Sequence, residues 1–228
     1  MVIVKSTLQA VQARIALAAQ KAGRKASEIS LLAVSKRQPA ESVRALAALG
    51  QHAFGESYVQ EGVAKIQALQ DVALDWHFIG PIQRNKTAPI AANFSWVHSV
   101  DRLVIAQRLS AERVNHSAPL NICLQVNVSN EVSKSGVSLA DVPALALAVR
   151  DLPNLRLRGL MAIPRAEVDE NKQRAQFALV RVCFDELNSM GLQLDTLSMG
   201  MSGDLEAAIA EGATIVRVGT ALFGKREG

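Results

Sequence analysis

One lysine in this chain lies where a covalent bond to a ligand could form. Lys36 ends a short apolar run over residues 29–36, and Pro39 marks a turn just after it. A side chain at such a strand end begins among apolar neighbours, and desolvation there disfavours the ammonium form. The neutral amine can attack a carbonyl carbon and form a Schiff base. Position alone also allows the alternative that Lys36 extends from the strand end into solvent.

Two turns near the C-terminal end of the chain combine glycine with a hydroxyl side chain. Ser202 and Gly203 belong to the first turn, Gly219 and Thr220 to the second, and each turn follows an apolar segment. Small residues let a ligand approach the backbone, and the free N–H groups at a helix start favour an anion. Either turn alone could be an ordinary helix cap. The two turns together predict a phosphate site.

An arginine interrupts the last apolar segment of the chain. Arg217 lies between Val216 and Val218. Because side chains alternate along a strand, Arg217 points either into the molecule or outward toward a helix. An inward arginine is a buried charge that needs a partner, whereas an outward one could pair with a helix carboxylate. The pattern leaves both orientations open.

The histidines and cysteines are dispersed along the chain and match no metal-binding spacing, so we expect no metal site. We assign no role to His77 or His98, because a lone histidine in an apolar strand is more often a core group than a catalyst. Cys123 and Cys183 each lie in an apolar run. Two buried thiols suit a reducing compartment.

A regular alternation of strand-like and helix-like segments would position these residues. Strands are expected within residues 29–36, 52–55, 76–79, 96–100, 121–128, 155–163, 196–199 and 215–218. A helix or helical turn follows each strand, with Asp101 expected as one N-cap. Eight such units predict a single closed (β/α)8 barrel, and an open doubly wound sheet is the main alternative. An extra helix is expected before the first strand, over about residues 5–23.

A barrel of this kind would bring the candidate residues together. Active sites of parallel barrels lie at the C-terminal ends of the strands, and the loops after strands seven and eight often form a phosphate site. Lys36 and the two glycine turns all follow expected strands. We expect residues 1–228 to form one domain, because no linker or low-complexity stretch interrupts the pattern.

Composition limits the classes of function. The chain has 228 residues, of which 49% are hydrophobic and 20% charged, and a formal net charge of +4. Lys and Arg are scattered, which argues against a nucleic-acid partner. We find no run long enough to span a membrane and no convincing secretory signal. We therefore expect a soluble cytoplasmic protein; the sequence does not determine its oligomeric state, and a monomer fits it.

Eight short motifs, in order, resemble those of one known family. They are Leu32-Ala-Val-Ser-Lys36, Phe54-Gly-Glu56, Trp76-His-Phe-Ile-Gly80, Gln83-Arg-Asn-Lys86, Ser133-Lys-Ser-Gly136, Arg158-Gly-Leu-Met-Ala-Ile-Pro164, Ser198-Met-Gly-Met-Ser202 and Val216-Arg-Val-Gly-Thr220. From about residue 30 to residue 224 the chain resembles the pyridoxal phosphate homeostasis proteins, also called the YggS or proline-synthetase co-transcribed family. The resemblance implies a barrel similar to the N-terminal domain of alanine racemase.

The same resemblance implies a cofactor and the residues that hold it. Pyridoxal 5′-phosphate (PLP) would form a Schiff base with Lys36, and Arg217 would face its pyridine nitrogen. Its phosphate would contact the two turns, through Ser202, Gly219 and Thr220. The chain departs from the family at residue 57, where similar proteins usually have Asn and this chain has Ser57, so a cofactor contact there is in doubt. Lys134 is the next candidate if Lys36 is not the attachment point.

Three functions fit a lysine and a phosphate site in a barrel. We favour a carrier that binds PLP, contributes to intracellular vitamin B6 homeostasis and passes the cofactor on, with apo forms of PLP-dependent enzymes as possible recipients. The alternative is a racemase-like PLP enzyme. Racemization needs acids or bases on both faces of the substrate carbon. In similar racemases a tyrosine from a second β-domain serves one face. We expect no such domain here, and the chain's single tyrosine is Tyr58.

The position of Arg217 also bears on catalysis. An arginine keeps its proton in a protein, so a pyridine nitrogen that accepts from it is unprotonated and the ring withdraws electrons less well. This argues against the enzyme hypothesis. The hypothesis stays open, because similar racemases use such an arginine. A class I aldolase is a third possibility. It needs an acid and base pair, and Glu56 is the only strand-end carboxylate that we can name.

Overall fold

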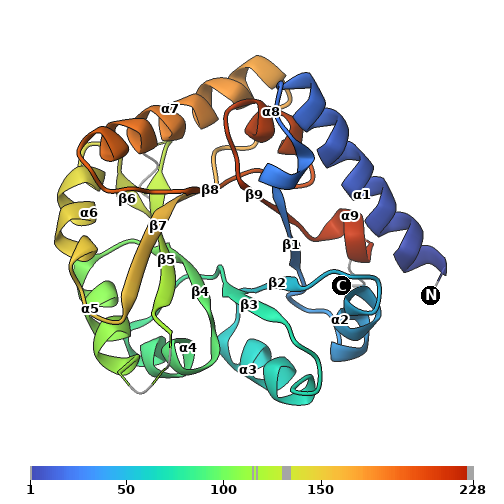
Figure 1. Cartoon of the computed structure of the whole chain (residues 1–228), viewed down its shortest axis with the longest axis horizontal. Coiled ribbons are helices and arrows are strands. Elements are labelled where there is room, and N and C mark those ends of the chain that lie inside the picture. Colours follow the sequence, from blue (N-terminus) through green and yellow to red (C-terminus); the bar gives the residue numbers. More distant parts are fainter. Residues whose placement is uncertain (1, 115, 117, 130–134, 225–228) are drawn as a thin grey trace.

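The computed structural model of the chain is a closed barrel of parallel strands inside a ring of helices (Figure 1). The structure describes residues 2–114, 116, 118–129 and 135–224. The strands are β1 (Ser30–Val34), β2 (Ala53–Glu56), β3 (Asp75–Phe78), β4 (Trp96–Val100), β5 (Leu120–Asn127), β6 (Val137–Ser138), β7 (Leu155–Ala162), β8 (Thr196–Ser198) and β9 (Ile215–Val218).

Strand pairing closes the barrel. The order is β4-β3-β2-β1-β9-β8-β7-β5, every pair is parallel, and a further pairing between β4 and β5 joins the two ends of this order. The (β/α)8 prediction is therefore confirmed, and the open doubly wound sheet is excluded. The two-residue β6 pairs with β5 outside the eight-stranded ring. It was not predicted, because two residues show no periodicity.

Helices follow the strands around the ring. They are α1 (Val2–Lys21), α2 (Ala40–Ala47), α3 (Val59–Ala68), α4 (Thr87–Asn93), α5 (Leu103–Glu112), α6 (Val142–Arg150), α7 (Glu170–Ser189), α8 (Leu205–Ala210) and α9 (Thr220–Phe223), with short 3-10 turns η1 (Ala26–Glu28) and η2 (Arg84–Lys86). The expected extra helix is α1. It lies on the outside of the barrel beside α8 and α9 (Figure 1), and its apolar residues Leu8, Val11, Ile15 and Ala19 are buried.

Two local predictions are wrong by one or two residues. Helix α5 begins at Leu103 and its N-cap is Arg102, with no side-chain cap. The carboxylate of Asp101 instead accepts a hydrogen bond from Arg102 Nε at 2.9 Å. Strand β1 ends at Val34, so Lys36 lies in the turn that follows the strand and not in its last position. Element ends are set by tertiary contacts that a local pattern does not contain.

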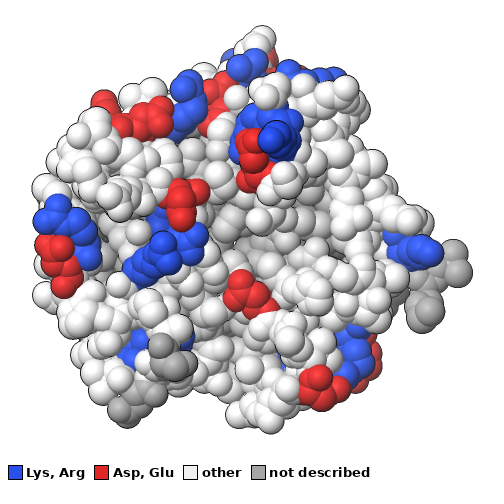
Figure 2. Space-filling model, viewed as in Figure 1, with Lys and Arg blue, Asp and Glu red and all other residues white. Residues whose placement is uncertain are grey.

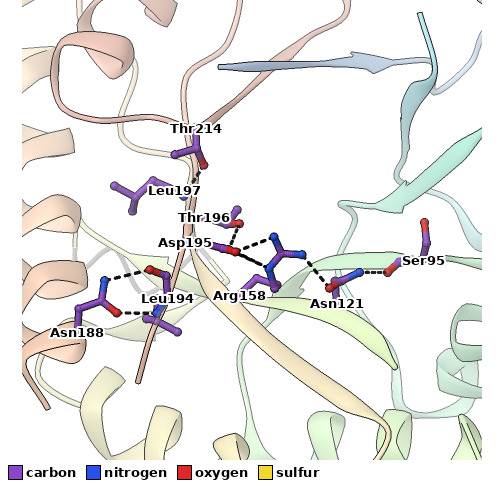
Figure 3. Close-up of polar contacts among 9 residues, drawn as sticks. All are labelled: Ser95, Asn121, Arg158, Asn188, Leu194, Asp195, Thr196, Leu197 and Thr214. Atoms are coloured by element: carbon purple, nitrogen blue, oxygen red, sulfur yellow. Dashed lines mark hydrogen bonds and ion pairs between the residues drawn. The ribbon is translucent and has the colours of Figure 1, made fainter. Parts of the chain in front are cut away.

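A polar network covers the N-terminal end of the barrel (Figure 3). Arg158 on β7 donates to both carboxylate oxygens of Asp195 at 2.8–3.0 Å and to Asn121 on β5 at 3.0 Å. Asn121 in turn donates to the carbonyl oxygen of Ser95, just before β4. The guanidinium of Arg158 also lies 4.6 Å from the ring centroid of Trp96. The network ties the starts of four strands together.

The described surface carries mixed charge. Figure 2 shows acidic and basic side chains interspersed on the face in view, without a large block of either sign. Within the described part of the chain, no helix is both long and apolar enough to cross a membrane. The same described residues include no group of three or more His, Cys, Asp or Glu side chains that could hold a metal ion.

Candidate functional site

A cavity opens at the C-terminal ends of the strands, and all five expected cofactor-binding residues line it. Its volume is about 250 Å³. The described lining residues are Val34, Lys36, Ser57, Ile79, Ile163, Met201, Ser202, Gly203, Arg217, Gly219 and Thr220. Ligand pockets usually measure about 300–1,000 Å³, so this cavity suits a small ligand. Ser57, at the position where the chain departs from the family pattern, is part of the lining.

Lys36 lies in a tight turn directly after β1. Its side chain is half-buried, and no hydrogen bond or ion pair joins its amine to any described residue. The next residue, Arg37, has φ of 61°, which is unusual for a residue with a side chain. The carboxylate of Glu61 accepts the N–H of Arg37 and helps to hold this conformation. The turn therefore keeps an unpaired amine at the edge of the cavity.

A buried ionic cluster supports that turn from behind. Lys65 on α3 donates to the carbonyl oxygen of Ser35 at 2.6 Å, to Glu56 at 2.7 Å and to Glu61 at 2.6 Å. The hydroxyl of Ser35 also donates to Glu56, at 2.6 Å. Burial raises the pKa of the Glu56 carboxyl, while the hydrogen bonds from Lys65 and Ser35 oppose the shift. Lys65 is fully engaged in this cluster, which distinguishes it from Lys36.

Sequence patterns did not indicate this cluster. The signals were present but weak: Glu61 and Lys65 are four residues apart on a helix, and Glu56 ends an apolar strand. What was missing is the spatial link, because nothing local indicates that α3 packs its lysine against the end of β1. Glu56 lies outside the cavity lining, and one of its oxygens, Oε2, is buried without a partner among the described residues.

The turn after β8 forms the first part of the expected phosphate site. The backbone N–H groups of Ser202 and Gly203 donate to no described residue. The carboxylate of Asp204 accepts a different N–H within the turn, at 2.6 Å, and so stabilises its shape. Gly200 has φ of 92°, and a Cβ added there would lie 2.5 Å from the Cβ of Ala208. Only glycine fits that position, because both the conformation and the contact exclude a side chain.

The turn after β9 forms the second part. Thr220 begins α9, and the backbone N–H groups of Thr220 and Ala221 have no acceptor among the described residues. Gly219 packs closely on β1, since a Cβ added there would lie 3.2 Å from the carbonyl oxygen of Val34. Free N–H groups in both turns therefore border the same cavity, an arrangement that favours an anion.

Helix α1 contacts the segments behind both turns. The hydroxyl of Thr7 donates to the carbonyl oxygen of Leu222 in α9 at 2.9 Å. Arg14 donates to the carbonyl oxygen of Ser202 at 3.1 Å and forms an ion pair with Glu206 in α8. The helix that precedes the barrel therefore helps to hold the two turns in place.

Arg217 points into the barrel and is buried. Its Nη1 donates to the carbonyl oxygen and hydroxyl of Ser198 at 2.5 and 2.9 Å, and its Nη2 donates to the carbonyl oxygen of Ala162 at 2.8 Å. Burial lowers the pKa of the guanidinium to about 10, although the charge of Asp204 partly offsets the effect. Arg217 therefore stays protonated at neutral pH. Neither its Nε–H nor its second Nη2–H donates to a described residue.

Tyr58, His77 and His98 are not among the described residues that line the cavity. Tyr58 is 47% exposed, and its hydroxyl accepts a hydrogen bond from Arg37 at 3.3 Å. Lys134 lies outside the described residues. Two buried histidines for which sequence patterns indicated no role, His77 and His98, are hydrogen-bonded to each other at 2.8 Å inside the barrel.

The fold and the cavity define a class of protein, a (β/α)8 barrel with a lysine at the cavity after its first strand and glycine turns after its last two. The model of one family, described as the alanine racemase N-terminal domain, matches residues 6–227. The structure of alanine racemase from Clostridium difficile 630 has the same fold, with a TM-score of 0.78. The match covers 100% of this chain and 58% of the alanine racemase chain, at 14% sequence identity.

Relatives with higher identity narrow the class. The pyridoxal phosphate homeostasis protein of Pseudomonas aeruginosa is 61% identical over 217 residues, covering 95% of this chain and 93% of the relative. The protein of the same name from Escherichia coli K12 is 49% identical over 223 residues, covering 96% and 95%. PipY of Synechococcus elongatus PCC7942, solved with PLP bound, gives a TM-score of 0.80 at 39% identity over 86% of this chain and 93% of that chain. The chain belongs to the alanine racemase N-terminal domain family and, within it, to the pyridoxal phosphate homeostasis proteins.

Proposed function

We propose that this chain binds PLP and contributes to intracellular vitamin B6 homeostasis. It holds the cofactor on Lys36 and passes it on without turning over a substrate. The observation that carries the proposal is the convergence of an unpaired lysine amine, a buried arginine and two turns with free N–H groups on one small cavity. PLP offers an aldehyde, a ring nitrogen and a phosphate, one for each of these features. The names of the relatives and the PLP-bound PipY structure support the same assignment.

Each residue then has one task. PLP would supply an aldehyde carbon, and the amine of Lys36 would be the group that holds it covalently. Ser202, Gly219 and Thr220 hold the phosphate through backbone N–H and hydroxyl groups. Arg217 directs its remaining N–H groups toward the pyridine nitrogen. We infer that Ser57 contributes to the cavity wall.

The cavity lining favours a carrier over an enzyme. Among its described residues the basic side chains are those of Lys36 and Arg217, and none is a carboxylate, histidine or tyrosine. A racemase needs a second acid or base on the opposite face, and an aldolase needs an acid and base pair. Tyr58 and Glu56 lie outside the lining. The relatives are named as homeostasis proteins, which accords with a carrier whose recipients are apo forms of PLP-dependent enzymes.

The remaining parts of the proposal concern the whole chain. We infer that residues 1–228 act as one domain, because the barrel and α1 share a core. We also infer a cytoplasmic location. Cys123 and Cys183 are free and buried, which suits a reducing compartment. Burial raises the pKa of Cys123 to about 12 and that of Cys183 to about 11, so neither thiol is reactive at neutral pH.

Borohydride trapping tests the assignment of Lys36. The protein should acquire a visible absorption band with PLP, and reduction should leave the cofactor covalently attached to the peptide that contains Lys36. Lys36→Ala should lose both signals, whereas Lys172→Ala, at an exposed position on α7, should keep them. A cofactor trapped elsewhere in the wild-type protein, or an unchanged band in Lys36→Ala, would show that the lysine assignment is wrong.

Turnover and transfer assays test the carrier role. Amino acids incubated with the loaded protein should show no racemization or decarboxylation at an ordinary enzyme rate. An apo form of a PLP-dependent enzyme should regain activity faster with the loaded protein than spontaneous release of PLP allows. Rapid turnover would contradict the carrier role, and transfer no faster than release would contradict active handing-on.

A further inference from the structure

A line of hydrogen bonds crosses the interior of the barrel, from Arg217 at the cavity to a carboxylate at the other end. Arg217 Nη1 donates to the hydroxyl of Ser198 at 2.9 Å, and that hydroxyl is 2.8 Å from His98 Nδ1. His98 Nε2 is 2.8 Å from His77 Nδ1, and His77 Nε2 is 3.1 Å from a carboxylate oxygen of Asp75. Each contact falls within hydrogen-bonding distance. The bonds form one continuous chain of five side chains.

This chain of hydrogen bonds runs along the length of the barrel and also crosses its interior. Asp75 is the first residue of β3 and Ser198 the last residue of β8, so the chain runs between opposite ends of the parallel strands. The His98–Ser198 bond joins β4 to β8, which do not pair in the sheet. It therefore crosses the interior. Ser198, His98, His77 and Arg217 are all buried, whereas the side chain of Asp75 is 45% exposed.

The two ends of the chain impose the same direction on its protons. An arginine can only donate, so Ser198 accepts from Arg217 and can donate its own proton to His98. An ionised carboxylate can only accept, so the nitrogen of His77 beside Asp75 carries a proton. When each imidazole carries one proton, both protons lie on Nε2 and both Nδ1 atoms accept. Every bond then has one donor and one acceptor.

Charge and packing along the hydrogen-bond chain agree with this direction. Burial lowers the pKa of His98 well below its ordinary value, and the charge of Arg217 adds to the effect, so His98 is uncharged. Burial raises the pKa of Asp75, but hydrogen bonds from His77 and Ser95 outweigh it, and the net pKa lies below the usual range. The ring of His77 is stacked on Trp96, with 5.3 Å between centroids and 3° between planes. The rings are thus held in register with their partners.

This chain of hydrogen bonds is suited to orienting the Arg217 side chain rather than to conducting protons. A proton wire needs an end group that releases its proton, and Arg217 keeps its proton at neutral pH. No carboxylate contacts Arg217 among the described residues. A chain with a fixed direction places the negative charge of Asp75 at one end and the guanidinium at the other, and such networks can strengthen each bond within them.

We propose that His98, His77 and Asp75 are positioning residues for Arg217. The chain fixes which N–H groups of Arg217 bond to the barrel, and so leaves the remaining ones aimed into the cavity. A change at Asp75, at the opposite end of the barrel, therefore alters the environment of a ligand that it never touches. The part of this inference that concerns PLP rests on the proposed function, whereas the direction of the chain does not.

Histidine NMR of the protein without cofactor tests the direction. The whole protein has four histidines, so the signals of ¹⁵N-labelled imidazoles can be assigned by single substitutions. In the form in which each imidazole carries one proton, we expect that proton on Nε2 in both His77 and His98. In Asp75→Asn the terminal amide can donate as well as accept, so we expect both tautomers to appear. A proton on Nδ1 of His98 in the wild-type protein, or unchanged tautomers in Asp75→Asn, would overturn the proposal.

Cofactor spectroscopy tests the consequence, with a matched control. Asp195→Asn removes a carboxylate at the same end of the barrel, with a side chain 48% exposed, but Asp195 pairs with Arg158 and not with the chain (Figure 3). We expect Asp75→Asn to weaken PLP binding about 5-fold, the loss of roughly one hydrogen bond. It should also shift the absorption maximum of the bound cofactor. Asp195→Asn should stay within about 2-fold of wild type, without a spectral shift.

Equal effects of the two variants on the affinity and spectrum of PLP would overturn the positioning role. If Asp75→Asn does not fold, Ser198→Ala interrupts the chain beside Arg217 and should give the same spectral shift, and its absence would count against the proposal. A wild-type protein that binds no PLP would contradict the proposed function instead, and the histidine tautomers would still decide the direction of the chain.

Discussion

Two lysines lie at the turn after β1, Lys36 in the turn itself and Lys65 on α3 behind it, and they differ in their partners. Lys65 donates to three oxygens and is buried with its counter-charges. Lys36 has no partner among the described residues and borders the cavity. An ammonium in a buried ion pair is costly to separate from its partners, because the buried charges would be left uncompensated. The chain therefore uses one lysine to hold a turn and presents the other to a ligand.

At the residue scale, His98 should make folding stability depend on pH. Its pKa lies well below the ordinary 6.5 in the folded state, so below about pH 6.5 the unfolded chain binds a proton that the folded chain does not. Stability is fully present above that pH and is lost as pH falls. The loss should approach about 1.4 kcal/mol per pH unit. Denaturant unfolding between pH 7 and pH 5 should show a shallower slope for His98→Gln than for the wild-type protein.

His52→Gln provides the control for this experiment. His52 is exposed and has no part in the interior chain, so its substitution should leave the slope of unfolding free energy against pH as in the wild type. Parallel slopes for His98→Gln and wild type would show that the folded protein tolerates a charged imidazole at position 98.

At the scale of elements, α1 supports both turns of the candidate phosphate site. The double variant Thr7→Val, Arg14→Met removes the bonds from α1 to the carbonyl oxygens of Leu222 and Ser202. Because Arg14 is partly exposed, each lost bond contributes modestly. We expect PLP affinity to fall about 3-fold to 10-fold, measured by titration of the visible absorption band.

The covalent attachment should survive in this double variant, because Lys36 belongs to a different element. Gln9→Ala changes an exposed side chain on the same helix and should leave affinity unchanged. If the double variant binds PLP as tightly as the control, α1 has no influence on the turns.

At the scale of the whole molecule, the cavity joins the two ends of the chain. Lys36 follows the first strand, and Arg217, Gly219 and Thr220 belong to or follow the last, which pairs with the first. A ligand that bridges them stabilises the closed barrel, because it binds the folded state alone. At 100 times its dissociation constant, PLP should raise the free energy of unfolding by about 2.7 kcal/mol.

Pyridoxal, which lacks the phosphate, is the matched ligand for this experiment. At the same concentration it should stabilise the protein much less, since it cannot engage the turns after β8 and β9. Equal stabilisation by pyridoxal and PLP, measured by chemical unfolding at each ligand concentration, would mean that these turns do not bind a phosphate.

The sequence by itself determined the architecture and the chemistry-bearing residues at the strand ends. Alternating apolar segments predicted eight β/α units. The position of Lys36, Gly219 and Thr220 after strands predicted that they lie together at the C-terminal end of the barrel. These are local signals, because periodicity and turn chemistry depend on neighbouring residues. The rule that parallel strands share their C-terminal edge then converted them into a spatial prediction.

Only the tertiary structure decided which polar groups are partners. The orientation of Arg217 was open, and its acceptors Ser198 and Ala162 are 19 and 55 residues away. His77 and His98 resembled ordinary core residues until barrel closure brought His98 to Ser198, 100 residues away in sequence. Such pairs leave no periodic trace, because a hydrogen bond depends on tenths of an ångström between strands that the chain brings together only when it folds.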